Sequence, residues 1–221
     1  MVPAVSSPPM SEAGGRGAPR RPPRSDQERV DRARMRTLAV VAVGLVIGVL
    51  VSFGQTHLAG VFRPLVDSAS AWLVAPFVLG ALMRTRHGAI AAGAVCALLQ
   101  LGAFAGTTAL RGVVLDTDLV WFWVACAVIG GPLFGGAGQL VRRGPAAWRG
   151  LGGAALAAMF LVEGTWTDFH ELHDDASGWL WVGVGLALCA ALLPTPVRLR
   201  WMALTVPLAL VGEVALTQIY R

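Results

Sequence analysis

The sequence has no lysine and few charged residues of any kind. Only 14% of its 221 residues are charged, all 18 basic residues are arginine, and 55% of the chain is hydrophobic. In soluble domains about a quarter of all residues are charged. This composition therefore excludes a water-soluble fold, a collagenous chain and a wholly disordered one. The mean hydropathy of +0.63 indicates a membrane protein instead.

Paired cysteines and catalytic motifs are also lacking. Cys96, Cys126 and Cys189 stand singly in apolar stretches, which excludes a zinc motif or disulfide framework and predicts that each packs as a small hydrophobic residue. The sequence contains no HExxH, no phosphate-binding loop, no GxSxG with a partner histidine and no paired-glutamate motif. We therefore expect no enzymatic activity and no cofactor.

The first 36 residues differ from the rest of the chain. Residues 1–36 hold eight arginines, many prolines and almost no large apolar side chains, so they cannot bury enough surface to offset their ordering entropy. We predict a disordered, arginine- and proline-rich cytoplasmic tail over 1–36 and a helical bundle over 37–219. Two interpretations of Arg29–Arg36 stay open, namely contact with an anionic lipid surface and a solvated flank.

From Thr37 onward, apolar runs alternate with short charged turns. Each run approaches the ~20 residues that a helix needs to cross ~30 Å of hydrocarbon, and none shows the alternation of a barrel strand. We predict an all-α polytopic membrane bundle of seven transmembrane helices. A six-helix alternative leaves the second run re-entrant, because Asp67, Ser68 and Ser70 occupy its start. The predicted spans are 37–54, 66–83, 88–110, 119–141, 150–167, 178–194 and 201–219.

The distribution of arginine predicts the orientation of this bundle. With the tail inside, 15 of the 18 arginines fall in the tail and the inner turns, leaving Arg63, Arg111 and Arg221 outside. This agrees with the excess of basic residues in cytoplasmic loops. We predict a bacterial plasma (inner) membrane protein with a cytoplasmic N-terminus and an extracytoplasmic C-terminus. The pI of about 10.4 then reflects topology, and no nucleic-acid partner is expected.

Three polar residues within the spans predict a binding site. Gln100, Glu163 and Glu213 lie at matched distances from the inner arginines, a little beyond the membrane midplane at 1.5 Å per residue. A carboxylate at that depth is costly and normally faces the bundle interior or water. We predict that the three side chains converge on a small solute or a cation. Structural hydrogen bonding is the alternative.

A second cluster lies in an outer turn. His170 and His173 are three residues apart, with Asp168, Asp174 and Asp175 around them. Imidazole and carboxylate groups at this spacing can bind a divalent ion if the turn is helical. The hypothesis is a metal site of His170, His173 and Asp174, and its alternative is an ordinary acidic loop.

Small residues predict how the helices pack. Gly44/Gly48, Gly102/Gly106 and Gly131/Gly135 are GxxxG pairs, which allow helix backbones to approach closely in lipid. Pro132 follows Gly130-Gly131 within the fourth span. We consider two interpretations of this sequence, a helix broken around a solute site and a simple proline kink.

Several short motifs resemble a family of small bacterial multi-pass membrane proteins, catalogued as a domain of unknown function. The resemblance implies a helical bundle in the bilayer and no activity. Two hypotheses about function follow, a carrier or solute-binding component with a small-molecule or cation ligand, and a non-transporting scaffold, sensor or partner subunit. The motifs are Ser52-Phe-Gly-Gln55, Val66-Asp-Ser-Ala-Ser-Ala-Trp72, Ala109-Leu-Arg-Gly112, Gly130-Gly-Pro-Leu-Phe-Gly135 and Val162-Glu-Gly164.

Overall fold

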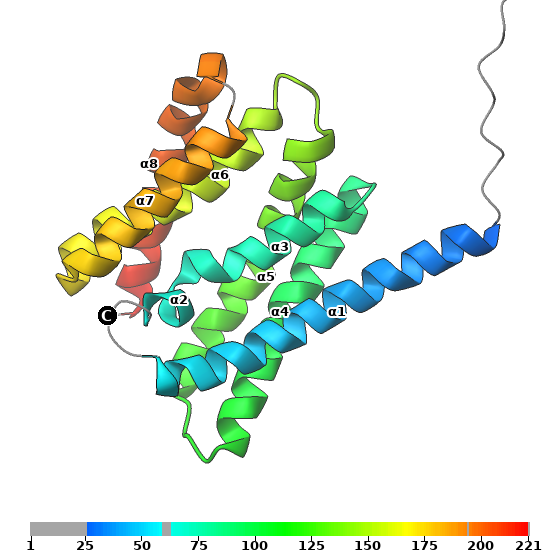
Figure 1. Cartoon of the computed structure of the whole chain (residues 1–221). Coiled ribbons are helices and arrows are strands. Elements are labelled where there is room, and N and C mark those ends of the chain that lie inside the picture. The colour runs from blue at the N-terminus through cyan, green and yellow to red at the C-terminus, as the bar shows by residue number, and fades with distance from the viewer. Residues whose placement is uncertain (1–25, 59–62, 194, 221) are drawn as a thin grey trace, which may run out of the picture.

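The protein folds into a bundle of α-helices (Figure 1). The computed structural model describes residues 26–58, 63–193 and 195–220, without the side chains of 26, 29, 64, 119, 170–172, 195–198, 213 and 215–220. A π-helical segment, η2, continues one of the helices. The elements are α1 (Asp26–His57), α2 (Pro64–Asp67), α3 (Ala69–Leu82), α4 (Arg86–Leu110), α5 (Thr117–Arg143), α6 (Arg149–Val162), η2 (Glu163–Leu172), α7 (Asp175–Leu192) and α8 (Thr195–Tyr220).

The helices confirm an all-α multi-pass membrane protein. Four segments are long and apolar enough to cross a bilayer: Val30–His57, Arg86–Leu110, Val120–Arg143 and Asp175–Leu192. Ala69–Leu82 and Leu199–Gly212 are shorter apolar helices. Large apolar side chains also cover the outside of the bundle, which is the surface that hydrocarbon would contact.

The first helix begins earlier than the sequence predicted. Residues 26–36 are helical and continue directly into the first span, so the predicted disorder is wrong for this part of the tail, whereas residues 1–25 lie outside the described chain. The prediction was based on the composition of residues 1–36 as a whole. The stretch from Asp26 to Arg36 contains no proline or glycine, so it can form a helix by itself. Arg32 also pairs with Glu28 at 3.6 Å, one helical turn away.

Two helices deviate from a simple span. The predicted second span divides at Ser68 into α2 and α3, and its longer part has only 14 residues, about 21 Å at 1.5 Å per residue. The predicted fifth span changes from α- to π-helix at Glu163. By contrast, α5 runs through Pro132 without interruption, so the broken helix considered there is absent.

Glycines bring the backbones of α3, α4 and α5 together. A Cβ atom added to Gly93 of α4 would overlap the carbonyl oxygen of Gly131 in α5, and one on Gly80 of α3 would overlap that of Gly135. The predicted pairing of Gly131/Gly135 is thus confirmed, as is that of Gly44/Gly48, which faces α4. The prediction for Gly102/Gly106 is wrong, because no atom of the described residues lies within 4 Å of a Cβ at either position.

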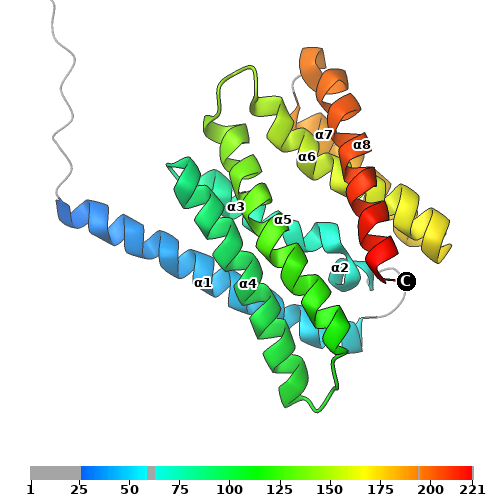
Figure 2. The ribbon, with the colours of Figure 1, turned by 180° about the vertical axis from the view of Figure 1, so that it is seen from behind.

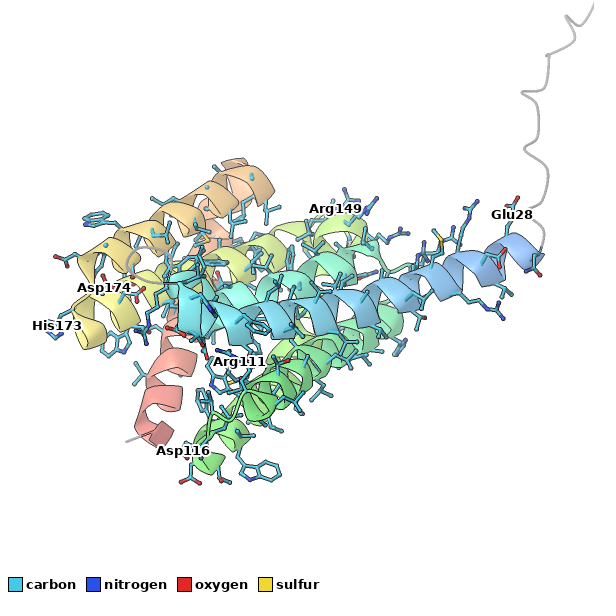
Figure 3. The ribbon with its side chains drawn as sticks, turned by 60° about the horizontal axis from the view of Figure 1, so that its bottom comes forward. Glu28, Arg111, Asp116, Arg149, His173 and Asp174 are labelled. Carbon is cyan, nitrogen blue, oxygen red and sulfur yellow. The ribbon has the colours of Figure 1, made fainter. Side chains whose placement is uncertain are left out.

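A polar cluster around Arg111 joins the end of α1 to the end of α4 (Figure 3). Arg111 donates hydrogen bonds to the Ser52 carbonyl and to Thr56, and its guanidinium lies 4.8 Å from the centre of the Phe53 ring. The Ser52 and Thr108 hydroxyl groups are 2.8 Å apart and buried. The cluster therefore links the last turns of α1 and α4 through polar groups.

We expect Gly93→Ala to lower the stability of the bundle by about 1–3 kcal/mol, the usual cost of overpacking. The added methyl group would overlap backbone atoms of α5, which cannot move away by a change of rotamer. Gly106→Ala on the same helix is the matched control and should be neutral or raise stability by up to ~1 kcal/mol. Thermal melts in detergent measure both. Equal melting temperatures for the two variants would contradict the packing of α4 on α5.

Candidate functional site

Glu163 binds the beginning of α3. Its side chain is only 7% exposed, and one carboxylate oxygen accepts hydrogen bonds from the Ser68 hydroxyl at 3.0 Å and the Ser70 amide at 2.8 Å. The other oxygen accepts from the amide of Ala69 at 3.1 Å. The Ser68 hydroxyl in turn accepts from the amide of Ala71 at 3.0 Å.

This geometry explains why a carboxylate is tolerated inside the bundle. The first amide groups of a helix have no partner within that helix, and the dipole makes this end positive. Each unsatisfied backbone group costs several kcal/mol in a hydrocarbon environment. Glu163 therefore provides acceptors and a compensating negative charge where α3 requires both.

Gln100 has a different environment. It is completely buried on α4, and its amide oxygen lies 3.6 Å from the Cys96 thiol. Its amide nitrogen has no hydrogen-bond partner within the described part of the chain. A buried donor without a partner costs about 1–3 kcal/mol, so this nitrogen requires an explanation.

Gln100 lines an apolar cavity of about 280 Å³, which we call the central cavity and whose lining also includes the exposed side chains of Leu133 and Leu208. Residues of α3, α4, α5, α6 and α8 form its walls. Trp72 and Trp123 stack on one another there, with ring centres 5.5 Å apart. Other wall residues are Ala69, Phe134, Met159 and Gly212. Among the described residues that line this cavity, Gln100 is the one that carries a side-chain amide.

Two of the three predicted polar residues, Gln100 and Glu163, are linked to the start of α3. The first residue of α3, Ala69, both lines the cavity beside Gln100 and donates its amide to Glu163. The side chain of Glu213 lies outside the described residues, although the adjacent Gly212 lines the same cavity. Convergence of all three residues on one ligand therefore stays a prediction.

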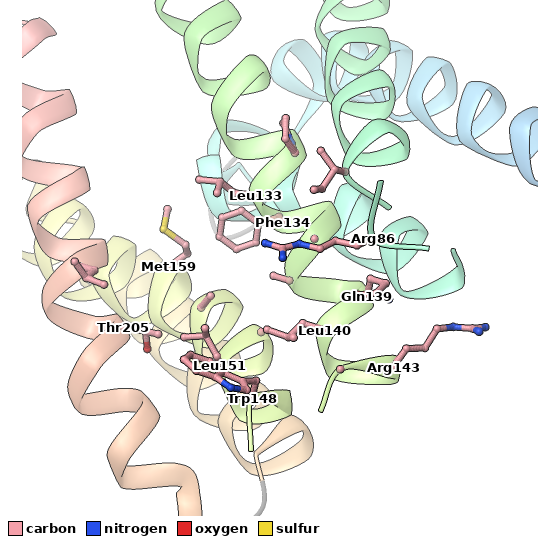
Figure 4. Close-up of a pocket in the computed structure, with 18 of the residues that line it drawn as sticks. Arg86, Leu133, Phe134, Gln139, Leu140, Arg143, Trp148, Leu151, Met159 and Thr205 are labelled. Atoms are coloured by element: carbon pink, nitrogen blue, oxygen red, sulfur yellow. The ribbon is translucent and has the colours of Figure 1, made fainter. Parts of the chain in front are cut away.

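A second cavity of about 880 Å³ lies at the arginine-rich end of the bundle (Figure 4). It is bounded by α5, α6, α8 and the first turn of α4. Arg86, Gln139, Arg143 and Trp148 line one part, whereas Leu133, Phe134, Met159 and Leu208 line another. All four of these apolar residues also line the central cavity, so the two cavities are adjacent. The sequence analysis had not predicted this cavity.

Asp174, a predicted metal ligand, makes hydrogen bonds within the protein. Asp174 caps α7 by accepting hydrogen bonds from the Ser177 amide at 3.3 Å and the Ser177 hydroxyl at 2.6 Å. These bonds lower the pKa of the Asp174 carboxyl below its ordinary value. His173 is exposed, with φ of 54° (Figure 3).

Within the described residues, no group of three histidine, cysteine, aspartate or glutamate side chains is placed to hold a metal ion. The side chain of His170 is not among those residues, so the proposed metal site of His170, His173 and Asp174 stays a prediction.

Comparison with known proteins identifies the family. Residues 27–221 match the family of unknown function DUF6518. The chain belongs to this family. The resemblance to an uncharacterised family of multi-pass membrane proteins is confirmed to that extent, and the family carries no assigned activity. No curated protein and no solved structure matches the chain.

We expect Glu163→Gln to destabilise the bundle by about 1–3 kcal/mol. The variant keeps the size of the side chain but removes the charge and points an amide donor at the donors of α3. Thermal melts would measure the loss, with exposed Asp175→Asn as the control for removing a carboxylate at the neighbouring helix. A Glu163→Gln protein as stable as this control would contradict the capping role.

Proposed function

We propose that this membrane protein binds a small, largely apolar molecule that carries a hydrogen-bond acceptor, and that it acts as a solute-binding or carrier component of the membrane. The observation that carries the proposal is the amide nitrogen of Gln100, which has no partner within the described residues and belongs to a residue that lines an apolar cavity. Ligand pockets generally combine apolar walls with a few polar groups that fix the orientation of the ligand. A carbonyl or ether oxygen would satisfy Gln100.

The walls favour a flat ligand. Trp72 and Trp123 are both cavity residues, and their rings are inclined by only 24°. One face of each ring is occupied by the other ring, and an opposite face would offer stacking to an aromatic or quinone-like ring. Glu163 is less suited to hold a cation, because both of its oxygens accept hydrogen bonds from the start of α3. The chemistry of the described cavity thus favours a neutral ligand over the cation considered from the sequence.

To test the proposal, 2,3-dimethyl-1,4-naphthoquinone can be compared with 2,3-dimethylnaphthalene, which has the same ring system without acceptors. We expect the quinone to raise the melting temperature more than the hydrocarbon does. Gln100→Met should lower quinone affinity roughly three- to tenfold, the contribution of one hydrogen bond, and leave hydrocarbon binding unchanged. Without ligand, the variant should be as stable as the parent or more so, because an unsatisfied donor is removed.

Gln139→Met is the matched control, since Gln139 lies on the adjacent helix and lines only the larger cavity. It should leave the preference for the quinone unchanged. Equal binding of both probes by the parent protein, or an undiminished preference in Gln100→Met, would contradict the role of Gln100. Failure of both probes to bind would favour the alternative of a scaffold or partner subunit.

We also propose seven crossings with the N-terminus inside. The connections α3–α4, α5–α6 and α7–α8 lie at one end of the bundle, and those of α4–α5 and η2–α7 lie at the other (Figure 1). Arg84, Arg142 and Arg143 lie at the first end, as basic residues on the cytoplasmic side would. The pair α2–α3 forms the second crossing in this arrangement.

Cysteine labelling of intact cells tests this orientation in a cysteine-free background. We expect an impermeant maleimide to label a cysteine at Ala176 and to spare one at Ala146, because these exposed positions lie at opposite ends of the bundle. Permeabilised cells provide the control, in which both positions should react. Labelling of Ala146→Cys in intact cells would contradict the orientation.

A further inference from the structure

The larger cavity combines two kinds of surface. Arg86, Arg143 and Trp148 line the part near the start of α4 and the end of α5, where the side chain of Arg143 points outward (Figure 4). Leu133, Phe134 and other apolar side chains line the part nearer the middle of the bundle (Figure 4). Tryptophan and arginine are typical of the membrane interface, and apolar walls of the hydrocarbon region. The cavity therefore extends from one environment into the other.

The cationic part lacks a counter-charge. Within the described residues, neither Arg86 nor Arg143 forms a salt bridge. Arg86 is the first residue of α4, whose first turn contains no acidic residue, so its charge adds to the positive end of the helix dipole. An anion bound here would relieve this repulsion and accept hydrogen bonds from guanidinium groups, which suit phosphate oxygens well.

The apolar part is accessible from the bilayer. α8 packs mainly against α6 and leaves α5 alongside it with little contact, as the view from behind illustrates (Figure 2). Leu133 of α5 is 63% exposed and Leu208 of α8 is 64% exposed, although both line the cavity. In a membrane, such a crevice is bounded by hydrocarbon, so an acyl chain can enter it without crossing water.

We propose that this cavity binds an acidic membrane lipid. Its phosphate group binds Arg86 at the mouth of the cavity, with Arg143 at the outer rim, and an acyl chain lies between α5 and α8 against Leu133, Phe134 and Leu208. This site is additional to the proposed function and does not depend on a ligand at Gln100. Because Phe134, Met159 and Leu208 also border the central cavity, the chain of the lipid would form part of the wall of that cavity.

The test compares phosphatidylglycerol with phosphatidylcholine of the same acyl chains, added to the full-length protein in dodecylmaltoside. Native mass spectrometry counts bound lipids, and thermal melts measure stabilisation. We expect phosphatidylglycerol to bind more tightly and to raise the melting temperature further. In Arg86→Gln/Arg143→Gln, the excess shift over phosphatidylcholine should fall by at least half.

Arg84→Gln/Arg142→Gln is the matched control. It removes the same charge at the same end of the bundle from two exposed residues that do not line the cavity, and it should keep the lipid preference. Ala155→Phe tests the apolar part without a change of charge, because Ala155 lines this cavity and not the central one. It should weaken binding of both lipids.

Three results would overturn the proposal. The first is equal stabilisation by the two lipids in the parent protein. The second is an equal loss in both arginine double variants, which would indicate attraction to surface charge in general. The third is stabilisation by glycerol 3-phosphate as large as that by phosphatidylglycerol, which would assign the site to a free phosphate compound. None of these results bears on the binding of naphthoquinone near Gln100, so the two proposals fail separately.

Discussion

The need to satisfy backbone groups away from water determines how this bundle is arranged. α3 starts within the protein, at buried Ser68, and not in the aqueous phase. Its first amides are satisfied by the carboxylate of Glu163 from the junction of α6 and η2. This single side chain connects the part of the bundle formed by α1–α5 to the part formed by α6–α8 with a charged group, which apolar packing alone would not provide.

Close backbone approach adds to the apolar packing that holds the first part together. Gly80, Gly93, Gly131 and Gly135 remove the side chains that would separate α3, α4 and α5, and dispersion contacts then act over a short distance. α8 has no comparable approach to α5. The same bundle therefore contains one tightly packed region and one crevice, and both cavities border the crevice through Phe134 and Leu208.

Much of the architecture could be predicted because hydrophobicity and length act locally. Continuous apolar runs identified the helices, and the fixed rise per residue placed Gln100 and Glu163 at similar depth. Depth does not specify which neighbour a side chain faces, however. Glu163 contacts Ser68, 95 residues earlier, and no local pattern encodes that distance, although Ser68 before an apolar run is itself a capping signal. Likewise, the GxxxG spacing of Gly102 and Gly106 could not reveal that no helix within the described residues packs on this face.

The contact between Glu163 and α3 has a consequence for biogenesis. A ribosome synthesises α3 well before residue 163, so α3 leaves the ribosome without the acceptor for its first amides. Its 14 residues span about 21 Å, less than the ~30 Å of hydrocarbon. We therefore expect stable insertion of α3 to depend on the arrival of α6, so that assembly in the membrane would not simply follow the order of synthesis.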